Sequence, residues 1–278
     1  MKRKKNWIVA TLFAALVSFQ TTAQNSLEKL WETDPNLPVP ESVLFDADAK
    51  VLYVSLIDGK GGEKDGKGGV ALVNLDGTIK NANWITGLNA PKGLGKYKGK
   101  LYIADLDEVV VADIKTGKVE QKISIPSAKF LNDVTVDKSG TVYVSDSQTK
   151  SIFQVKNHVP SVYFESPERP NGLLALGNDL LILDSGKLYK LDKNKKLTQL
   201  AEGMEKSTDG IEQVKPGEYI VSCWIGVVYY VTDKGQVKTL LDTRESSTNS
   251  ADIGYDAKKK IVYIPTFAKN SVAAYQLK

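Results

Sequence analysis

The segment FLNDVTVDKSGTVYVSDSQTKSIFQV, from Phe130 to Val155, decides the fold. It contains three runs rich in β-branched and aromatic residues: Asp133–Asp137, Thr141–Asp146 and Ser151–Val155. The breaks between these runs consist of a glycine and short polar residues, which favour turns. The segment therefore predicts three antiparallel strands joined by tight turns.

The same pattern recurs along the chain. Each copy is aligned on a polar residue that is followed by a small or acidic residue and then an aliphatic one. The six starting positions, with an alanine in the last copy, are Glu41, Lys92, Asn132, Asn171, Asp209 and Ala251. The spacings between them are 51, 40, 39, 38 and 42 residues. The first spacing is long because it includes an insertion of 11 glycine- and lysine-rich residues, Gly59–Gly69. A period near 40 residues with about four short strands per unit is typical of a β-propeller blade.

The last copy has no fourth strand of its own, because the chain ends at Lys278 directly after the third. The run Leu27–Glu32 is left over at the other end of the chain. We expect this N-terminal strand to pair into the last blade, which closes the ring and removes an open sheet edge. The sequence therefore predicts an all-β, six-bladed β-propeller that forms one domain over residues 24–278, with almost no helix.

The first residues have the features of a secretory signal peptide. Four basic residues, Lys2–Lys5, precede the apolar run Trp7–Phe19, and the small residue Ala23 follows. This arrangement predicts a signal peptide over residues 1–23, cleaved near Ala23. The apolar run is too short to span a bilayer comfortably. We therefore expect a periplasmic or secreted protein without a membrane anchor.

The net charge of the chain comes from this leader. The whole chain has 37 basic and 33 acidic residues, and the leader holds four of the basic residues and no acidic ones. The remaining chain is therefore balanced, which gives no support for a nucleic-acid partner. We expect a monomer that acts on a small molecule.

The chain has a single histidine, His158, and a single cysteine, Cys223. Cys223 lies in an apolar run and is expected to be buried, whereas His158 follows a strand and is expected at the surface. They are too far apart in repeat position to form a catalytic triad with serine or cysteine as nucleophile. A histidine-rich zinc site is excluded outright.

The insertion Gly59–Gly69 is interpreted as a flexible surface loop. It would cover the channel mouth only if the loops of the first blade fall on that face. The tryptophans Trp31, Trp84 and Trp224 lie in probable strands or at strand ends, and we expect them to pack rather than to stack on a ligand.

The six starting positions are expected to meet in space, because the innermost strands of a propeller run beside its central channel. Four of them provide two carboxylates and two amide oxygens: Glu41, Asn132, Asn171 and Asp209. An all-oxygen set of this kind suits a hard divalent cation, most simply Ca²⁺. The alternative is that each polar residue only caps the backbone of its own loop.

Four motifs at blade spacing resemble those of the SMP-30/gluconolactonase/LRE-like family of six-bladed propellers. They are PES (Pro40–Ser42), FLNDVTVD with GTVYVSD (Phe130–Asp146), RPNGLL (Arg169–Leu174) and TDGIE (Thr208–Glu212). The resemblance covers essentially all of the chain after the leader. It implies one divalent metal ion held by Glu41, Asn171 and Asp209, with Asn132 nearby.

The enzymes of that family open sugar lactones and related esters, so the resemblance implies metal-dependent hydrolysis of a small lactone or ester. The implied metal is Ca²⁺, with Zn²⁺ or Mn²⁺ as alternatives, and the implied catalytic base is Asp209. Asn132 and Lys92 are the candidate contacts to the substrate. Lys92 would hold a substrate carboxylate or, in a protein without metal, neutralise Glu41.

Two other functions fit the same residues. The first is an exported propeller without catalytic activity that uses this face to bind a ligand or a protein partner, with a structural cation or none. The second is a condensing enzyme similar to the relatives of strictosidine synthase, which would need an acid or base deeper in the pocket.

Overall fold

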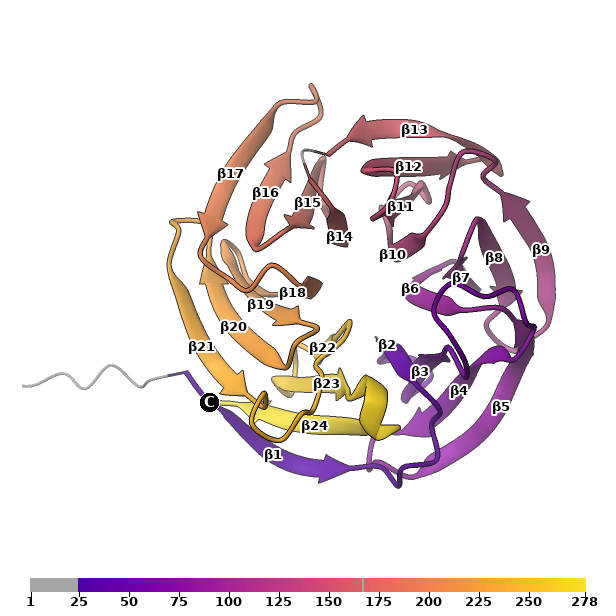
Figure 1. Cartoon of the computed structure of the whole chain (residues 1–278), viewed down its shortest axis with the longest axis horizontal. Coiled ribbons are helices and arrows are strands. Elements are labelled where there is room, and N and C mark those ends of the chain that lie inside the picture. Colours follow the sequence, from indigo (N-terminus) through magenta and orange to yellow (C-terminus); the bar gives the residue numbers. More distant parts are fainter. Residues whose placement is uncertain (1–24, 167) are drawn as a thin grey trace, which may run out of the picture.

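The structure, a computed structural model, describes residues 25–166 and 168–278. These residues form six four-stranded antiparallel sheets, which are arranged as a ring around a central channel (Figure 1). The predicted six-bladed β-propeller is therefore confirmed. The predicted signal peptide lies outside the described residues.

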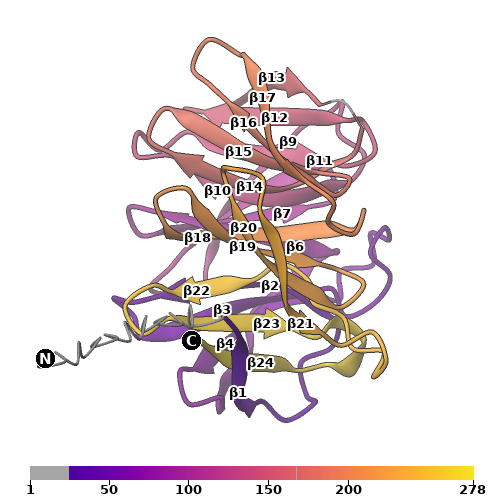
Figure 2. The ribbon, with the colours of Figure 1, turned by 90° about the vertical axis from the view of Figure 1, so that its left-hand side faces the viewer.

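Each blade runs from an innermost strand at the channel to an outermost strand at the rim (Figures 1 and 2). The innermost strands are β2 (Pro40–Asp46), β6 (Pro91–Tyr97), β10 (Leu131–Val136), β14 (Pro170–Leu176), β18 (Thr208–Lys215) and β22 (Gly254–Asp256). The second strands are β3 (Val51–Leu56), β7 (Lys100–Asp105), β11 (Val142–Asp146), β15 (Asp179–Asp184), β19 (Glu218–Cys223) and β23 (Ile261–Pro265).

The third and fourth positions complete the sheets. The third strands are β4 (Gly68–Asn74), β8 (Glu108–Asp113), β12 (Ser151–Lys156), β16 (Lys187–Leu191), β20 (Val227–Thr232) and β24 (Val272–Leu277). The outermost strands are β5 (Ile79–Leu88), β9 (Val119–Ser124), β13 (Val159–Glu165), β17 (Leu197–Glu202), β21 (Val237–Asp242) and, for the last blade, β1 (Leu27–Glu32).

The hydrophobic core is divided among the contacts between neighbouring blades. The second strands are apolar on both faces, because each face packs against an adjacent blade; all of β3 is buried. Between the second and third blades, for example, Val109 and Val111 pack with Val144 and Phe153. The outermost strands are mostly exposed or partly exposed. Burial of apolar surface between blades is thus what holds the ring together.

The ring closes as the sequence predicts. Strand β1 pairs antiparallel with β24, and the register joins Leu27 to Leu277 and Glu32 to Ala273. The bonding continues beyond β1, where the Thr33 backbone N–H donates to the Val272 carbonyl at 2.9 Å. The first described strand therefore supplies the missing outer strand of the last blade.

Some element boundaries differ from the prediction. Gly68 and Gly69, which we assigned to the insertion, open strand β4 instead. A Cβ on Gly68 would lie 2.4 Å from Pro91 Cδ, so this position accepts only glycine where the third strand passes the next blade. The helical content of the described residues is one 3₁₀ turn, Phe267–Lys269. In the described part of the chain, no helix has the length and apolar character that crossing a membrane requires.

Candidate functional site at the mouth of the central channel

The innermost strands share a β-bulge at the position where each sequence repeat starts. In β2, Pro40 pairs with Leu56 and Val43 pairs with Val54, so that two residues, Glu41 and Ser42, oppose the single residue Ser55. The same irregularity recurs in β6, β10, β14 and β18. A bulge turns a side chain out of the regular alternation of a strand. Here it brings the first residue of each repeat to the channel mouth.

The bulge leaves one backbone N–H without a partner in the ladder. A serine hydroxyl on the neighbouring strand accepts a hydrogen bond from this N–H. The Ser42 N–H donates to Ser55 Oγ at 2.9 Å, and the Asp133 N–H donates to Ser145 Oγ at 2.9 Å. In the fifth blade the Gly210 N–H donates to Ser222 Oγ at 2.8 Å. These buried serines are positioning residues that the sequence analysis missed. Their sequence signal is a serine in the apolar second strand of three repeats.

The second residue of each bulge is small or acidic because neighbouring inner strands approach one another closely. A Cβ on Gly172 would lie 2.0 Å from the Asp209 carbonyl oxygen, and one on Gly93 would lie 2.5 Å from the Asp133 Cα. Where this residue is Asp133, its carboxylate instead accepts the Leu173 N–H of the next blade at 2.6 Å. The motif therefore fixes the spacing of the blades around the channel.

Buried aspartates fix the loops that lead into three of the inner strands. Asp105, Asp146 and Asp184 end the second strands of blades two, three and four, and all are at most 1% exposed. Each accepts backbone N–H groups of the preceding loop; for example, the Arg169 N–H donates to Asp184 Oδ1 at 2.7 Å. The loops at this face are therefore rigidly tied to the sheets.

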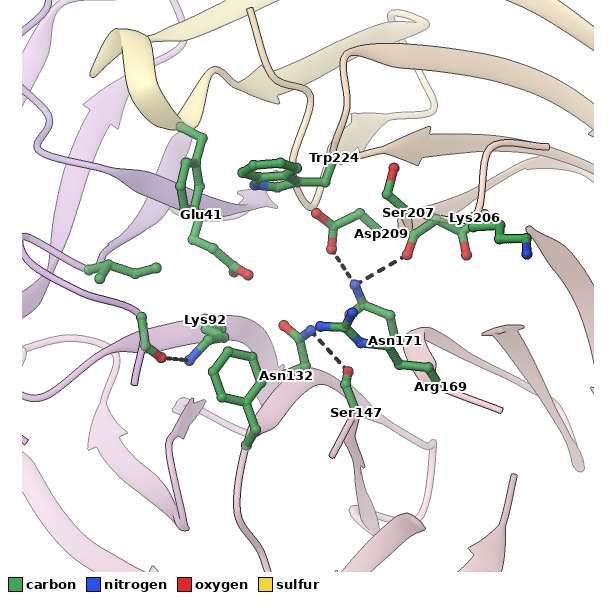
Figure 3. A pocket seen from close by; sticks show the side chains of 15 residues that line it. Glu41, Lys92, Asn132, Ser147, Arg169, Asn171, Lys206, Ser207, Asp209 and Trp224 are labelled. Carbon is green, nitrogen blue, oxygen red and sulfur yellow. Dashed lines mark hydrogen bonds between the residues drawn. The ribbon is translucent and has the colours of Figure 1, made fainter. Parts of the chain in front are cut away.

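The predicted ring residues meet in one cavity of about 360 Å³ (Figure 3). Five of the six starting positions line it: Glu41, Lys92, Asn132, Asn171 and Asp209. The sixth, Ala251, is fully buried outside the lining. These residues are separated by up to 168 positions in sequence, yet they lie side by side because each starts an inner strand.

Hydrogen bonds orient both amide side chains of the ring. Asn171 Nδ2 donates to Asp209 Oδ1 at 2.8 Å and to the Thr208 carbonyl at 3.2 Å. Asn132 Nδ2 donates to Ser147 Oγ at 3.2 Å, and that hydroxyl donates to the Pro170 carbonyl at 2.7 Å. The amide nitrogens are thereby used, and the amide oxygens are left as acceptors for the pocket (Figure 3).

Two buried oxygens of the ring have no hydrogen-bond partner among the described residues: Glu41 Oε2 and Asn171 Oδ1. Buried polar atoms are nearly always satisfied, so unpaired ones call for a bound group or water. Oxygens of this type are suitable ligands for a hard cation. Within the described residues, no three acidic, histidine or cysteine side chains lie close enough to share an ion. Any cation held here would therefore depend on the amide oxygens as well as on the two carboxylates.

Both ring carboxyls resist ionisation. Burial, and then the nearby charge of Asp209, raise the pKa of Glu41 well above its usual range, and Lys92 opposes the shift. Burial and the charge of Asp133 raise the pKa of Asp209 to about 7, whereas the hydrogen bond from Asn171 lowers it. Buried carboxyls that oppose each other's ionisation favour a proton or a bound cation between them.

Lys92 is 2% exposed and is held mainly by backbone. Its ammonium donates to the carbonyls of Ala90 at 3.0 Å and Gly61 at 3.1 Å, and it lies 4.3 Å from the centre of the Phe130 ring. Burial lowers its pKa, although the charges of Glu41 and other carboxylates oppose this. The charge of Glu41 thus favours the ammonium form of Lys92, but the two side chains make no direct ion pair in the described structure.

The contact with Gly61 places the insertion on the same face as the ring. Gly61 lines the cavity, and Lys64 on the same loop forms an ion pair with Asp107 of the second blade at 2.7 Å. The loop therefore crosses from the first blade to the second and forms one wall of the mouth.

Trp224 packs on another side chain, as expected, but it is more exposed than Trp31 and Trp84. Trp224 is 43% exposed and lines the cavity, where its ring meets Phe267 edge to face at 5.4 Å. Trp31 and Trp84 also pack as expected, against Tyr263 and Tyr53. Trp224 differs because β19 ends at Cys223, so the tryptophan falls in the following turn.

The predicted positions of Cys223 and His158 are confirmed. Cys223 is fully buried, and burial raises the pKa of its thiol well above the usual range. His158 is exposed in the turn between β12 and β13. Neither residue can serve as a nucleophile or base in the cavity.

Sequence reasoning also missed residues that loops bring to the mouth. Arg169, Lys206, Phe130 and Phe267 line the cavity. Arg169 and Phe130 directly precede inner-strand motifs, so their place in the repeat was a usable signal. Phe267 comes from the loop after β23 and carries no such signal.

A second cavity of about 200 Å³ lies further along the inner strands, with Asp133, Glu212 and Asp252 in its lining. Burial and the charge of Asp133 raise the pKa of Glu212 to about 8, although a backbone N–H of Tyr255 opposes the shift. Burial raises the pKa of Asp133 to about 7. The channel thus contains several carboxyl groups whose pKa values are raised, so that the neutral form of each is favoured.

Replacing Glu212→Gln is expected to stabilise the cation-free protein in a pH-dependent way. The folded-state pKa of about 8 lies above the usual 4.5, so the stabilising effect of the protonated form is complete below pH 4.5 and is lost as the pH rises through 8. The glutamine does not titrate. In chelator, the melting temperature of the variant minus that of the wild type should therefore increase as the pH rises from about 5 to about 9. A difference that is constant across this range would contradict the assignment.

The fold is similar to that of several solved structures. A streptogramin B lyase has a TM-score of 0.65 and 11% identity, with 92% of this chain and 98% of that chain covered. A catalytically inactive variant of virginiamycin B lyase from Staphylococcus aureus, solved with quinupristin, has a TM-score of 0.64 and 12% identity, with coverage of 92% and 100%. A candidate gluconolactonase has a TM-score of 0.67 and 14% identity, with coverage of 92% and 93%.

At these identities the likeness shows the propeller fold alone. The neighbours include a candidate gluconolactonase, as the motif resemblance implies, but they also include lyases. No protein-family model matches the chain, and no curated protein sequence matches it. Membership of the SMP-30/gluconolactonase/LRE-like family therefore stays a prediction from the motifs.

Proposed function

We propose that the protein is a metal-dependent hydrolase of small lactones or esters. The observation that carries this proposal is a pair of buried oxygens, Glu41 Oε2 and Asn171 Oδ1, which have no hydrogen-bond partner among the described residues and belong to residues that line the same cavity as Asp209. The donor set of Glu41, Asn132, Asn171 and Asp209 fits Ca²⁺, and Zn²⁺ or Mn²⁺ are alternatives. A bound divalent cation supplies polarisation of an ester carbonyl and a lowered pKa for an attacking water.

In this proposal Asp209 is the base. Burial raises the pKa of Asp209 in the cation-free site and a bound cation would lower it, so the assignment as base rests on the place of the carboxylate in the cavity. The Asn171 amide, which donates to Asp209 Oδ1 at 2.8 Å, fixes the direction of the carboxylate. Asp209 takes a proton from water as the water oxygen bonds to the carbonyl carbon. The proton then passes to the leaving alkoxide as the ester C–O bond breaks.

Two other residues of the cavity support the cation site in this proposal. Asn132 presents its amide oxygen to the ring, because its amide nitrogen is bound to Ser147. Lys92 keeps a positive charge close to Glu41 and thereby limits the repulsion between the two ring carboxylates. No histidine or cysteine is needed for this chemistry, which agrees with the burial of Cys223 and the distant surface position of His158.

The test is hydrolysis of a panel of lactones and simple esters by the purified protein loaded with Ca²⁺, Zn²⁺ or Mn²⁺. Replacing Asp209→Asn is expected to lower kcat by about 100-fold or more, because positioned bases contribute on that scale. The exposed Glu245 provides a matched control, and Glu245→Gln should retain wild-type rates. Absence of hydrolysis across the panel with every metal would overturn the proposal.

The alternative, a propeller that binds a ligand without catalysis, predicts a different combination of results. In that case a cation would raise the melting temperature, yet no hydrolysis would accompany it. The export of the protein is a separate proposal. Amino-terminal sequencing of protein recovered outside the cytoplasm should find a chain that starts near Gln24, directly after the predicted leader.

A further inference from the structure

One positively charged side chain in the cavity, that of Arg169, takes no part in the proposed metal site. The Arg169 side chain is exposed and reaches inward over the cavity, beside Asn132 and Asn171 (Figure 3). Its backbone, by contrast, is fixed, because its N–H donates to the fully buried Asp184 at 2.7 Å. Within the described residues, the guanidinium has neither a hydrogen-bond acceptor nor an ion-pair partner. A cation on an anchored backbone, with its five donors free, is suited to binding an anion.

The other charges of the cavity support an anionic occupant. The two ring carboxylates, Glu41 and Asp209, are offset by two cations, Lys92 and Arg169. A divalent cation on the ring would therefore leave the cavity with an excess of positive charge, which an anionic ligand would balance. Lys92 cannot take the role of Arg169, because its ammonium is buried and already donates to two carbonyls. Lys206 also lines the cavity, but its ammonium turns away from the ring (Figure 3).

The opposite wall of the cavity is aromatic. Trp224 lies across the cavity from Arg169 (Figure 3) and meets Phe267 edge to face, with an interplanar angle of 80°. Phe267 is held at a φ of 48°, a left-handed conformation that bulky residues rarely adopt. Such strain persists where the surroundings impose it, and it clusters at ligand-binding sites. The Phe267 ring packs on the small cluster of Ile57, Ala90 and Leu106, which keeps it at the mouth.

We infer that the ligand of this cavity is an amphipathic anion, in which a carboxylate or phosphate group binds Arg169 and an apolar, preferably aromatic, body stacks on Trp224. This inference rests on the proposed function only for the substrate class of the same site, which becomes an ester or lactone that carries a second, anionic group. The binding itself requires no hydrolysis. It can therefore be tested with molecules that cannot react.

The test uses the intrinsic fluorescence of the purified protein, to which Trp224 contributes as the exposed tryptophan among the residues that the structure describes. Phenylacetate and phenyl phosphate are titrated as anionic probes, and phenylacetamide is titrated as a neutral isostere, each with Ca²⁺ and with chelator. The anions are expected to bind at least about tenfold more tightly than the amide, because hydrogen bonds to charged groups are the strong ones. Trp224→Phe is expected to reduce the signal change and confirm its origin.

Three charge variants decide whether Arg169 is responsible. Arg169→Gln is expected to weaken anion binding by about tenfold and to leave phenylacetamide unchanged, and Arg169→Lys should restore part of the loss. Lys206→Gln removes the same charge from the same mouth and should change anion binding by less than about twofold. Equal affinity for anion and amide, an unaffected Arg169→Gln variant, or equal losses in the two glutamine variants would each overturn the inference.

The outcomes separate this inference from the proposed function. Hydrolysis of neutral lactones with no dependence on Arg169 would reject the anionic ligand and keep the hydrolase. Anion binding that depends on Arg169, without hydrolysis of any carboxylate- or phosphate-bearing ester under any metal, would keep the ligand class and reject the hydrolase.

Discussion

Adding saturating Ca²⁺ to the chelator-treated protein is expected to raise its melting temperature by about 5–10 °C, and Glu41→Gln is expected to remove most of this rise. A ligand at about 100 times its dissociation constant stabilises a protein by about 2.7 kcal/mol, and a domain of this size gains roughly 2–4 °C for each kcal/mol. Glu41 supplies one of the two ring carboxylates, and its Oε2 has no other partner among the described residues. Differential scanning fluorimetry with and without Ca²⁺ measures the effect.

The same substitution should act in the opposite direction without a cation. Burial and the charge of Asp209 make ionised Glu41 costly in the folded state, as its raised pKa shows. A neutral glutamine avoids this cost, so in chelator near pH 8 the variant should melt at or above the wild-type temperature. Glu63→Gln is the control, because Glu63 is exposed on the nearby loop and, among the described residues, forms an ion pair with Lys60 alone. A Glu41→Gln protein with the full Ca²⁺ response would exclude Glu41 as a ligand.

Removing the closing strand is expected to have the second large effect. A chain that starts at Asp34 lacks β1 and leaves β24 as an open edge, which exposes unpaired backbone groups to aggregation. It also loses Trp31, whose indole donates to the Leu75 carbonyl of the first blade at 3.1 Å and packs on Tyr263. We expect the truncated protein to be largely insoluble or to melt far below the full chain.

Point substitutions in β1 test the same idea in folded protein. Trp31→Ala should cost about 3 kcal/mol or more, as loss of a packed aromatic side chain usually does, which corresponds to a fall of roughly 6–12 °C in melting temperature. Leu30→Ala is the matched control, because Leu30 lies on the same strand but is 46% exposed. Its effect should stay within about 0.5 kcal/mol. Equal effects of the two substitutions would show that the contacts of Trp31 in β1 do not stabilise the packing of the last blade against the first.

Much of the architecture was predictable because a propeller is built from local repeats. Each blade is a meander of consecutive strands, so the period near 40 residues and the alternation within each run specify it without knowledge of distant contacts. The position of Leu27–Glu32 followed from the absence of a fourth strand before Lys278. The insertion was located correctly but was assigned two residues too many. Gly68 and Gly69 resemble a loop, yet they lie in β4, where Gly68 passes close to Pro91 and Gly69 passes close to the Ile85 carbonyl.

The ring residues were predictable for the same reason, since equivalent positions in equivalent blades face one channel. Glu41, Asn171 and Asp209 line one cavity because the bulge recurs in their strands. The role of Lys92 was not settled by its position. Its ammonium binds the Gly61 carbonyl, and only the path of the insertion across the mouth provides that partner.

The sequence by itself determined the number of blades, their closure and the set of polar residues at the channel, because all of these follow from a repeat in which each unit folds with its neighbours in the chain. Only the tertiary structure decided which residues complete the cavity wall. Arg169, Trp224 and Phe267 come from loops of three different blades, and their residue types do not recur at the equivalent positions of the other repeats. Their meeting depends on the closed ring, which sets how near the loops of separate blades approach one another.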